Sequence, residues 1–384
     1  MQRDAAALKA ALADLEQRNL KRTRRVMPRD GLINFCSNDY LGLSGHPEVV
    51  RAFTAAAERH GVGSGASHLV TGHGVEHEAL EAALAEFTGR DCAVVFSTGY
   101  MANMGVISAL ADQKALLVSD KLNHASLIDG CRLTDAEVRR FRHADVEHAR
   151  ALLGTAAPAQ TTRLLITDGI FSMDGDLAPL PELVRAANDA NAWLIVDDAH
   201  ALGVIGHSGR GSCDHFELSP SDVPVLIGTF GKAFGTFGAF VAGDADLIDY
   251  LIQKSRTYIY TTALPPAVAA ATRAALVVSE RESWRREKAL ALTRRLHAGL
   301  IDRGLGSRCP ALPPSGTIVP VTFGDEGRTL AASRALEARG LLVAAIRPPT
   351  VPAGTARLRI TLSAVHEETH VDTLIDALSQ VIAA

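Results

Sequence analysis

Short apolar runs alternate with helical patterns through the middle of the chain. The runs are four or five residues long and continuously apolar, and most are separated by segments with helical periodicity. Such runs are typical of strands that are buried on both faces of a mainly parallel sheet. The predicted strands are residues 93–96, 115–119, 138–141, 164–167, 193–196 and 225–228. The pattern therefore predicts a large α/β domain with helices on both faces of its sheet.

The two ends of the chain have different patterns of apolar and polar residues from the middle. Residues 5–21 place Leu8, Leu12 and Leu15 at helical spacing before a basic cluster, which predicts an amphipathic helix that could pack on a neighbouring subunit or domain. From about residue 265, a long helical stretch precedes predicted strands at 317–323, 341–346 and 356–361 and a final helix from 367. We therefore expect three parts: an N-terminal helix and arm (1–45), a large α/β domain (46–275) and a small α+β domain (276–384).

Composition narrows the class of protein. The chain has 384 residues, of which 47% are hydrophobic and 21% charged, as in an ordinary globular protein. A net charge of -4 argues against nucleic acid or an anionic membrane as the main partner. Five widely spaced cysteines are expected to be free thiols in a reducing compartment. With no membrane-span or signal-peptide pattern, we expect a cytoplasmic protein.

Lys232 is the only charge in the apolar, glycine-rich segment 223–243. A lysine that is removed from water has a lowered pKa, and its neutral amine can attack a carbonyl to form a Schiff base. The alternative is an ordinary exposed lysine in a loop between two strands, and this segment by itself favours that alternative.

Polar residues follow several of the predicted strands, at residues 99–100, 120–124, 168–172, 197–200 and 229–232. In open α/β sheets, ligands bind at the carboxyl ends of the strands. A pyridoxal phosphate enzyme needs a lysine, an acid for the ring nitrogen and a phosphate cup.

Lys232 supplies the first of these groups, and either Asp197 or Asp198 could supply the second, although a carboxylate at a strand end can also simply cap a helix. The start of the helix at Gly99 and Tyr100, together with the Thr229 hydroxyl, could supply the cup.

Other chemistries fit the sequence poorly. Residues 61–66 match a dinucleotide-binding fingerprint but follow a predicted helix instead of a strand, and segment 61–74 is too rich in glycine to predict regular structure. Residues 228–233 resemble part of a P-loop, but residue 226, where its first glycine would lie, is Leu, and Ala233 replaces the magnesium-binding hydroxyl. No metal-ligand spacing is present, despite 14 histidines.

Six motifs in order resemble the α-oxoamine synthases, over nearly the whole chain. They are Ser37–Leu43, Gly63–His68, Asn123–Ser126, Phe171–Gly175, Asp197–His200 and Thr229–Gly235. These enzymes are fold-type-I pyridoxal phosphate transferases with the aspartate aminotransferase-like fold, and they join an amino acid to an acyl thioester with loss of CO2. The chain departs from the family at Ala201 and Leu202, where Gly-Thr is frequent, which leaves the local loop geometry open.

The resemblance implies roles for residues around the cofactor. Lys232 would hold pyridoxal phosphate as a Schiff base, and Asp197, which the family pattern favours over Asp198, would keep the ring nitrogen protonated. His124 would stack on one face of the ring and Ala199 on the other. Further contacts are implied for His200 and Ser172 near the phenolic oxygen, for Gly99, Tyr100 and Thr229 at the phosphate, and for Thr261 or Thr262 of the partner subunit in a homodimer with shared active sites.

Substrate contacts are implied as well. Arg359 resembles the clamp for the carboxylate of the amino acid, a task suited to a guanidinium. Arg22 and Thr350 match contacts of the acyl substrate, with Asn38 and Arg347 as further candidates. For Arg22, a solvated helix end is an equally good interpretation.

The run Ile346–Thr361 is most similar to family members that condense L-alanine with a pimeloyl thioester in biotin synthesis. In that reaction Lys232 would remove the Cα proton of alanine. The sequence leaves open whether coenzyme A or an acyl carrier protein carries the acyl group. Two alternatives remain: a glycine-using member, such as 2-amino-3-oxobutyrate CoA ligase or 5-aminolevulinate synthase, and a non-catalytic α/β protein whose basic N-terminal helix holds an acidic partner.

Overall fold

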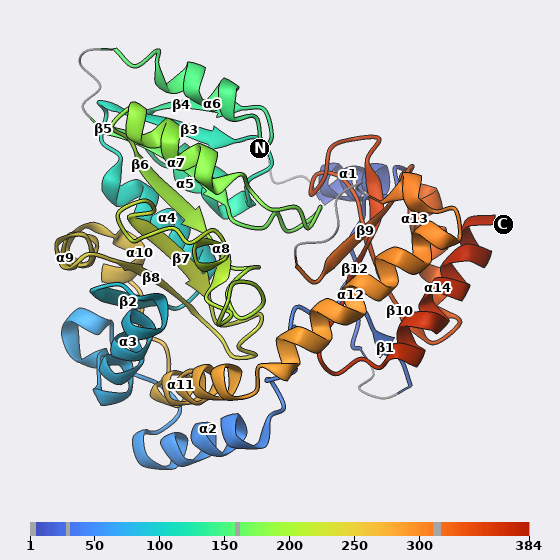
Figure 1. Ribbon diagram of the computed structural model, residues 1–384, viewed down its shortest axis with the longest axis horizontal. Helices are drawn as coiled ribbons and strands as arrows, with labels where there is room; N and C mark the ends of the chain where they lie inside the picture. The colour runs from blue at the N-terminus through green and yellow to red at the C-terminus, as the bar shows by residue number, and fades with distance from the viewer. Residues whose placement is uncertain (1–4, 28–30, 158–161, 310–315, 384) are drawn as a thin grey trace.

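The computed structural model describes residues 5–27, 31–157, 162–309 and 316–383. Figure 1 shows a larger body built around one sheet and a smaller body at the C-terminal end of the chain. The long helix α12 (Trp284–Asp302) leads from the edge of the larger body into the smaller one.

The large sheet contains seven strands within the described ranges, in the order β2-β8-β7-β6-β5-β3-β4. Only β8 runs antiparallel to its neighbours in this part of the chain, so β2 points the same way as the parallel strands. The strands are β2 (Cys92–Phe96), β3 (Ala115–Asp120), β4 (Glu137–Phe141), β5 (Thr162–Asp168), β6 (Trp193–Asp197), β7 (Val225–Thr229) and β8 (Ala239–Gly243). The six predicted strands match β2 to β7, whereas β8 was not predicted as a separate strand.

Helices cover both faces of this sheet, as the continuous apolar runs predict. Leu164 and Ile166 of β5 face one layer of helices, and Leu165 between them faces the other. The first layer is α4 (Gly99–Leu110), α5 (Ala125–Arg132), α9 (Ala245–Lys254) and α10 (Arg256–Ile259). The second layer includes α3 (Val75–Thr88), α6 (Val146–Leu153), α7 (Leu180–Asp189) and the short α8 (Gly211–His215). On this side α11 (Pro266–Arg281) packs against both α3 and α2 (Pro47–His60). The predicted α/β fold class is confirmed.

The smaller body has an antiparallel sheet in the order β11-β12-β9 within the described residues. Its strands are β9 (Ile318–Gly324), β11 (Ala344–Ile346) and β12 (Ala356–Thr361), and its helices are α12, α13 (Glu326–Glu337), α14 (Glu368–Ala383) and the 3-10 turn η2 (Gly306–Arg308). β10 (Leu341–Leu342) pairs instead with β1 (Ile33–Asn34) in a parallel pair. The single strand predicted at 341–346 is therefore two short strands in different sheets.

Two further segments bear on the predictions. The N-terminal helix α1 (Ala5–Gln17) exists, and its leucines are exposed, with Leu8 at 63%. Within segment 61–74, which was predicted to be irregular, His68–Gly72 forms a π-helical turn, so that prediction was wrong there. Its closure depends on glycine, because a Cβ on Gly72 would lie 2.0 Å from the carbonyl oxygen of Ala66. The division of the chain at residues 45 and 275 stays a prediction.

No helix in the described part of the chain has the length and apolar character needed to cross a membrane.

Candidate functional site

The candidate residues meet because they follow strands that run in the same direction. Gly99 follows β2, His124 follows β3 and Ser172 follows β5. Asp197 is the last residue of β6, and Lys232 lies three residues beyond β7. Since the carboxyl ends of parallel strands lie along one edge of a sheet, the fold gathers these five residues there.

Lys232 lies in the tight connection between β7 and β8. This connection is held by its own backbone, with Thr236 N donating to Phe230 O at 2.9 Å and Gly235 N donating to Lys232 O at 2.9 Å. The amine of Lys232 has no hydrogen-bond or ion-pair partner among the described residues. A rigid loop therefore presents an unpaired amine.

Burial lowers the pKa of Lys232 from 10.5 to about 8, although the carboxylates of Asp197 and Asp168 act to raise it. The Arg359 guanidinium adds to the lowering. A large share of this amine is consequently neutral near pH 8, which is the form that attacks carbonyls and accepts protons.

The structure separates the roles of the two adjacent aspartates. Asp198 is fully buried, and both of its carboxylate oxygens accept hydrogen bonds from Ser212, from the backbone N at 2.8 Å and from the hydroxyl at 2.5 Å. Asp197 accepts from Ala199 N at 3.0 Å and from Asn103 Nδ2 at 2.6 Å. Asp198 therefore anchors the neighbouring segment, and the Asn103 amide orients the carboxylate of Asp197. Asn103 was not singled out from the sequence.

His124 is fixed on several sides. Its Nδ1 lies 2.6 Å from Ser126 Oγ, and its backbone N donates to Asp168 Oδ2 at 2.7 Å. The ring stands edge-on to Tyr100, with centroids 6.4 Å apart. Burial lowers the pKa of His124, with Lys232 contributing and Asp197 opposing, so the imidazole is neutral at physiological pH.

Asp168 is a second buried carboxyl in the site that the sequence pattern did not single out. Burial raises its pKa, and the nearby Asp197 carboxylate raises it further. Two carboxylates close together in a buried site do not ionise independently. Depending on its protonation state, Asp168 thus places either a negative charge or a proton next to the backbone N of His124.

The start of α4 supplies anion-binding donors. Thr98 caps the helix by accepting from Met101 N at 3.1 Å, which leaves the backbone N–H groups of Gly99 and Tyr100 free of the cap. A Cβ placed on Gly99 would lie 3.9 Å from the hydroxyl oxygen of Thr229, so β7 and α4 face each other here. The Thr229 hydroxyl donates to Gly238 O at 3.0 Å and has to rotate to serve an anion.

A connected set of polar side chains lies on the side of the site that faces the smaller body. Arg359 Nε donates to Ser172 O at 2.5 Å, and its Nη1 donates to Asn38 Oδ1 at 3.1 Å. The Tyr40 hydroxyl lies 3.1 Å from Asn38 Oδ1 and 2.7 Å from His200 Nδ1. Arg359, Asn38, Ser172 and His200 were predicted from the sequence, whereas Tyr40 was not.

The candidates for the acyl substrate lie together at the surface. Arg22 Nη2 donates to Thr350 Oγ1 at 3.3 Å, and Arg347 donates to the carbonyl of Asn19. Burial and the adjacent Arg22 lower the pKa of Arg347. Two neighbouring positive charges of this kind favour an anionic ligand. The contribution of Thr261 or Thr262 across a subunit interface stays a prediction.

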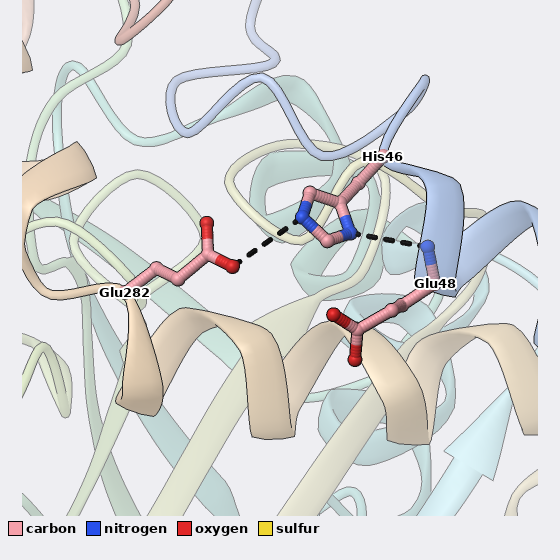
Figure 2. Close-up of side chains that lie close together, drawn as sticks. All are labelled: His46, Glu48 and Glu282. Carbon is pink, nitrogen blue, oxygen red and sulfur yellow. Dashed lines mark hydrogen bonds and ion pairs between the residues drawn. The ribbon is translucent and has the colours of Figure 1, made fainter.

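One cluster of His and Glu side chains outside this edge resembles a metal site. Figure 2 shows His46 with one ring nitrogen towards Glu282, at 3.4 Å, and the other towards the backbone N of Glu48. Both carboxylates, however, are already paired with guanidinium groups, Glu48 with Arg281 at 2.6 Å and Glu282 with Arg285 at 2.8 Å. We therefore interpret the cluster as an ion-pair network where the start of α2 meets the end of α11.

The residues at the sheet edge fit pyridoxal phosphate. The site offers an amine without a partner, a carboxylate held by an amide, and free N–H groups at a helix start. The glycine at position 99 leaves the approach to those N–H groups open, with no atom closer than 3.9 Å to its Cβ position.

Comparisons with known proteins point the same way. Residues 30–378 match the family model for aminotransferase class I and II. The 8-amino-7-oxononanoate synthase of Methylococcus capsulatus is 56% identical over 384 positions, covering 97% of each chain. That of Alkalilimnicola ehrlichii is 55% identical over 351 positions, covering 91% of this chain and 88% of the relative.

Solved structures are similar as well. A lysine-to-alanine variant of serine palmitoyltransferase from S. paucimobilis, with a bound PLP-myriocin aldimine, superposes with a TM-score of 0.92, at 32% identity, over 99% of this chain and 98% of that chain. An 8-amino-7-oxononanoate synthase from Francisella tularensis gives a TM-score of 0.79, at 27% identity, over 92% and 98%.

Proposed function

The chain belongs to the class I and II aminotransferase family and, within it, to the 8-amino-7-oxononanoate synthases, and from this we infer that it is a pyridoxal phosphate-dependent acyltransferase of biotin biosynthesis. We propose that it condenses L-alanine with a pimeloyl thioester to give 8-amino-7-oxononanoate, CO2 and the free thiol. The observation that carries this proposal is the unpaired amine of Lys232, whose pKa of about 8 makes it available both to bind an aldehyde and to move a proton.

Pyridoxal phosphate supplies an aldehyde that binds amines and a ring that absorbs the electrons released when a bond to Cα breaks. Lys232 would hold the aldehyde carbon at rest, and its neutral amine would then take the proton from alanine Cα. Asp197 would keep a proton on the ring nitrogen, and Asn103 orients its carboxylate for this. His124 would cover one face of the ring, held there by Ser126.

The remaining residues would position the two substrates. Arg359 would bind the alanine carboxylate, since its bonds to Ser172 O and Asn38 leave other N–H groups of the guanidinium unused. Arg22 and Thr350, which are hydrogen-bonded to each other, would contact the acyl substrate near Arg347. We propose that the enzyme works in the cytoplasm as a homodimer whose subunits share active sites.

The direct test is product identification by mass spectrometry after incubation with L-alanine and pimeloyl-CoA. We expect 8-amino-7-oxononanoate from the wild type and none from Lys232→Ala, which should also lose the visible absorption of bound cofactor. Lys114→Ala is the matched control, because Lys114 is exposed and precedes β3 at the opposite edge of the sheet. Full activity of Lys232→Ala would contradict the proposal.

A second assay separates this reaction from that of the glycine-using relatives. Titration of cofactor absorbance with alanine and with glycine should give tighter binding for alanine. Preference for glycine, with turnover of a shorter acyl thioester, would reassign the substrates and leave the cofactor chemistry unchanged.

A further inference from the structure

Tyr40 connects two parts of the site, around His200 and around Arg359, to which the proposed function gives different roles. It is fully buried, and its hydroxyl lies between His200 Nδ1 at 2.7 Å and Asn38 Oδ1 at 3.1 Å. Asn38 in turn accepts a hydrogen bond from Arg359. The Tyr40 hydroxyl therefore connects His200 with Arg359, the candidate clamp for the substrate carboxylate.

The direction of these hydrogen bonds follows from the number of protons available. A guanidinium only donates, so the atom of Asn38 that faces Arg359 must be its oxygen, which is also the atom that faces Tyr40. The phenol has one proton to give, and two acceptors compete for it. Its contact with His200 is the shorter one, and 2.7 Å suits an O–H donor better than an N–H donor, for which about 2.9–3.0 Å is usual. The Arg359 bond already occupies the amide oxygen, which weakens it as the competing acceptor.

The charge states agree with this direction. Burial raises the pKa of Tyr40, so the phenol keeps its proton, even though Arg359 acts in the opposite sense. Burial together with Lys232, Arg359 and His124 lowers the pKa of His200, so its imidazole is neutral. A neutral imidazole that accepts at Nδ1 carries its proton on Nε2.

We propose that Tyr40 is a positioning residue that donates to His200 Nδ1 and so fixes the tautomer whose Nε2–H is offered to an oxygen of the bound ligand. Nε2 has no partner among the described residues, and it is not sealed off as an orphaned buried atom. The ligand oxygen that this donor suits best is an anionic one, such as a phenolate, because the bond is then charge-assisted. The identity of that oxygen rests on the proposed function, whereas the tautomer of His200 does not.

The test is nitrogen NMR on deuterated holoenzyme labelled with 15N at histidine, which distinguishes protonated, hydrogen-bonded and free ring nitrogens. The His200 signals among those of the 14 histidines are identified by their loss in His200→Gln. We expect a protonated Nε2 and an unprotonated, hydrogen-bonded Nδ1 in the wild type. In Tyr40→Phe, Nδ1 should move to the position of a nitrogen without a donor.

Two further variants make the result specific. Asn38→Ala should leave the proton on Nε2, because Tyr40 still donates to His200. Tyr258→Phe is the matched control: it removes the hydroxyl of another buried tyrosine, which stacks on His68 at 4.8 Å, and should leave the His200 signals unchanged.

A protonated Nδ1 in the wild type, or an Nδ1 signal that Tyr40→Phe does not move, overturns the proposal. If the expected pattern is found in a protein that makes no product from alanine, the proposed reaction fails while the tautomer stands.

Discussion

Replacing Lys232 with methionine should stabilise the cofactor-free protein against urea at neutral pH. In the native protein, burial holds the pKa of this amine at about 8, against 10.5 for the usual side chain. Below pH 8 the amine is charged in both states, and the native state bears the cost of keeping that charge away from water. Methionine has a similar length and no charge, so the variant avoids this cost.

The size of the effect follows from the shift. Each pKa unit corresponds to about 1.4 kcal/mol, so the shift is worth about 3 kcal/mol in full. The Lys232 side chain is only half-buried, and water screens part of its charge, so we expect about 2 kcal/mol at pH 7. Between pH 8 and 10.5 the native state releases the proton before the unfolded chain does, so the stability of the wild type rises with pH. The advantage of the variant should therefore shrink across that window.

The assay is urea unfolding of the cofactor-free wild type and of Lys232→Met, at one protein concentration and at pH values from 7 to 10.5. Lys114→Met, at an exposed lysine, is the control and should change stability little at any pH. A Lys232→Met protein no more stable than the wild type at pH 7, or an advantage that does not vary with pH, would refute the assigned amine environment.

Three other changes test single contacts. His143→Leu should lower the free energy of unfolding in urea by about 1–3 kcal/mol. Although burial acts to lower the pKa of His143, its bonds to Asp120 and Asp176 raise that pKa to about 10. The stability that His143 adds is therefore complete below pH 6.5 and is lost as the pH rises through 10. A cost that persists unchanged above pH 10 would rule this out. Asn103→Leu should weaken cofactor binding about tenfold in an absorbance titration, because it loses a hydrogen bond to a carboxylate; unchanged affinity would remove the amide from the site. Arg359→Lys should lower kcat/KM for alanine about a hundredfold, since a lysine cannot form the bidentate contact, with little change in KM for the acyl donor; the reverse pattern would assign the arginine to the acyl substrate.

Local rules predicted the sheet and suggested Lys232, the Asp197–Asp198 pair and the helix start at Gly99, whereas the roles of most other candidate site residues were implied by the family resemblance. An apolar strand followed by a polar residue is visible within ten positions, and parallel strands place those polar residues on one edge. The local pattern could not choose between Asp197 and Asp198. The structure separates them through Ser212, which is 14 residues away and bonds both oxygens of Asp198.

Other features depend on long-range contacts that a single sequence does not encode locally. Tyr40 lies 160 residues from His200, and Asn103 lies 94 residues from Asp197. Tyr40 also lies within the motif Ser37–Leu43, but the local sequence does not show that a tyrosine in this loop is buried. Strand β8 was missed because glycines recur throughout the segment around Lys232, so Gly238, which directly precedes the strand, did not stand out as its boundary.

The segment from Ile33 to Leu43 spans the junction between the two bodies. At one end it is hydrogen-bonded into the smaller body through the parallel pairing of β1 with β10, and at the other Tyr40, Leu41 and Leu43 are buried in the core of the larger body. Both anchors are fixed, so the segment acts as a short mechanical tether. Any rotation of the smaller body would pull on Asn38, midway along the segment, and on Tyr40 at its anchored end, so the motion would reach His200 through its contact with Tyr40.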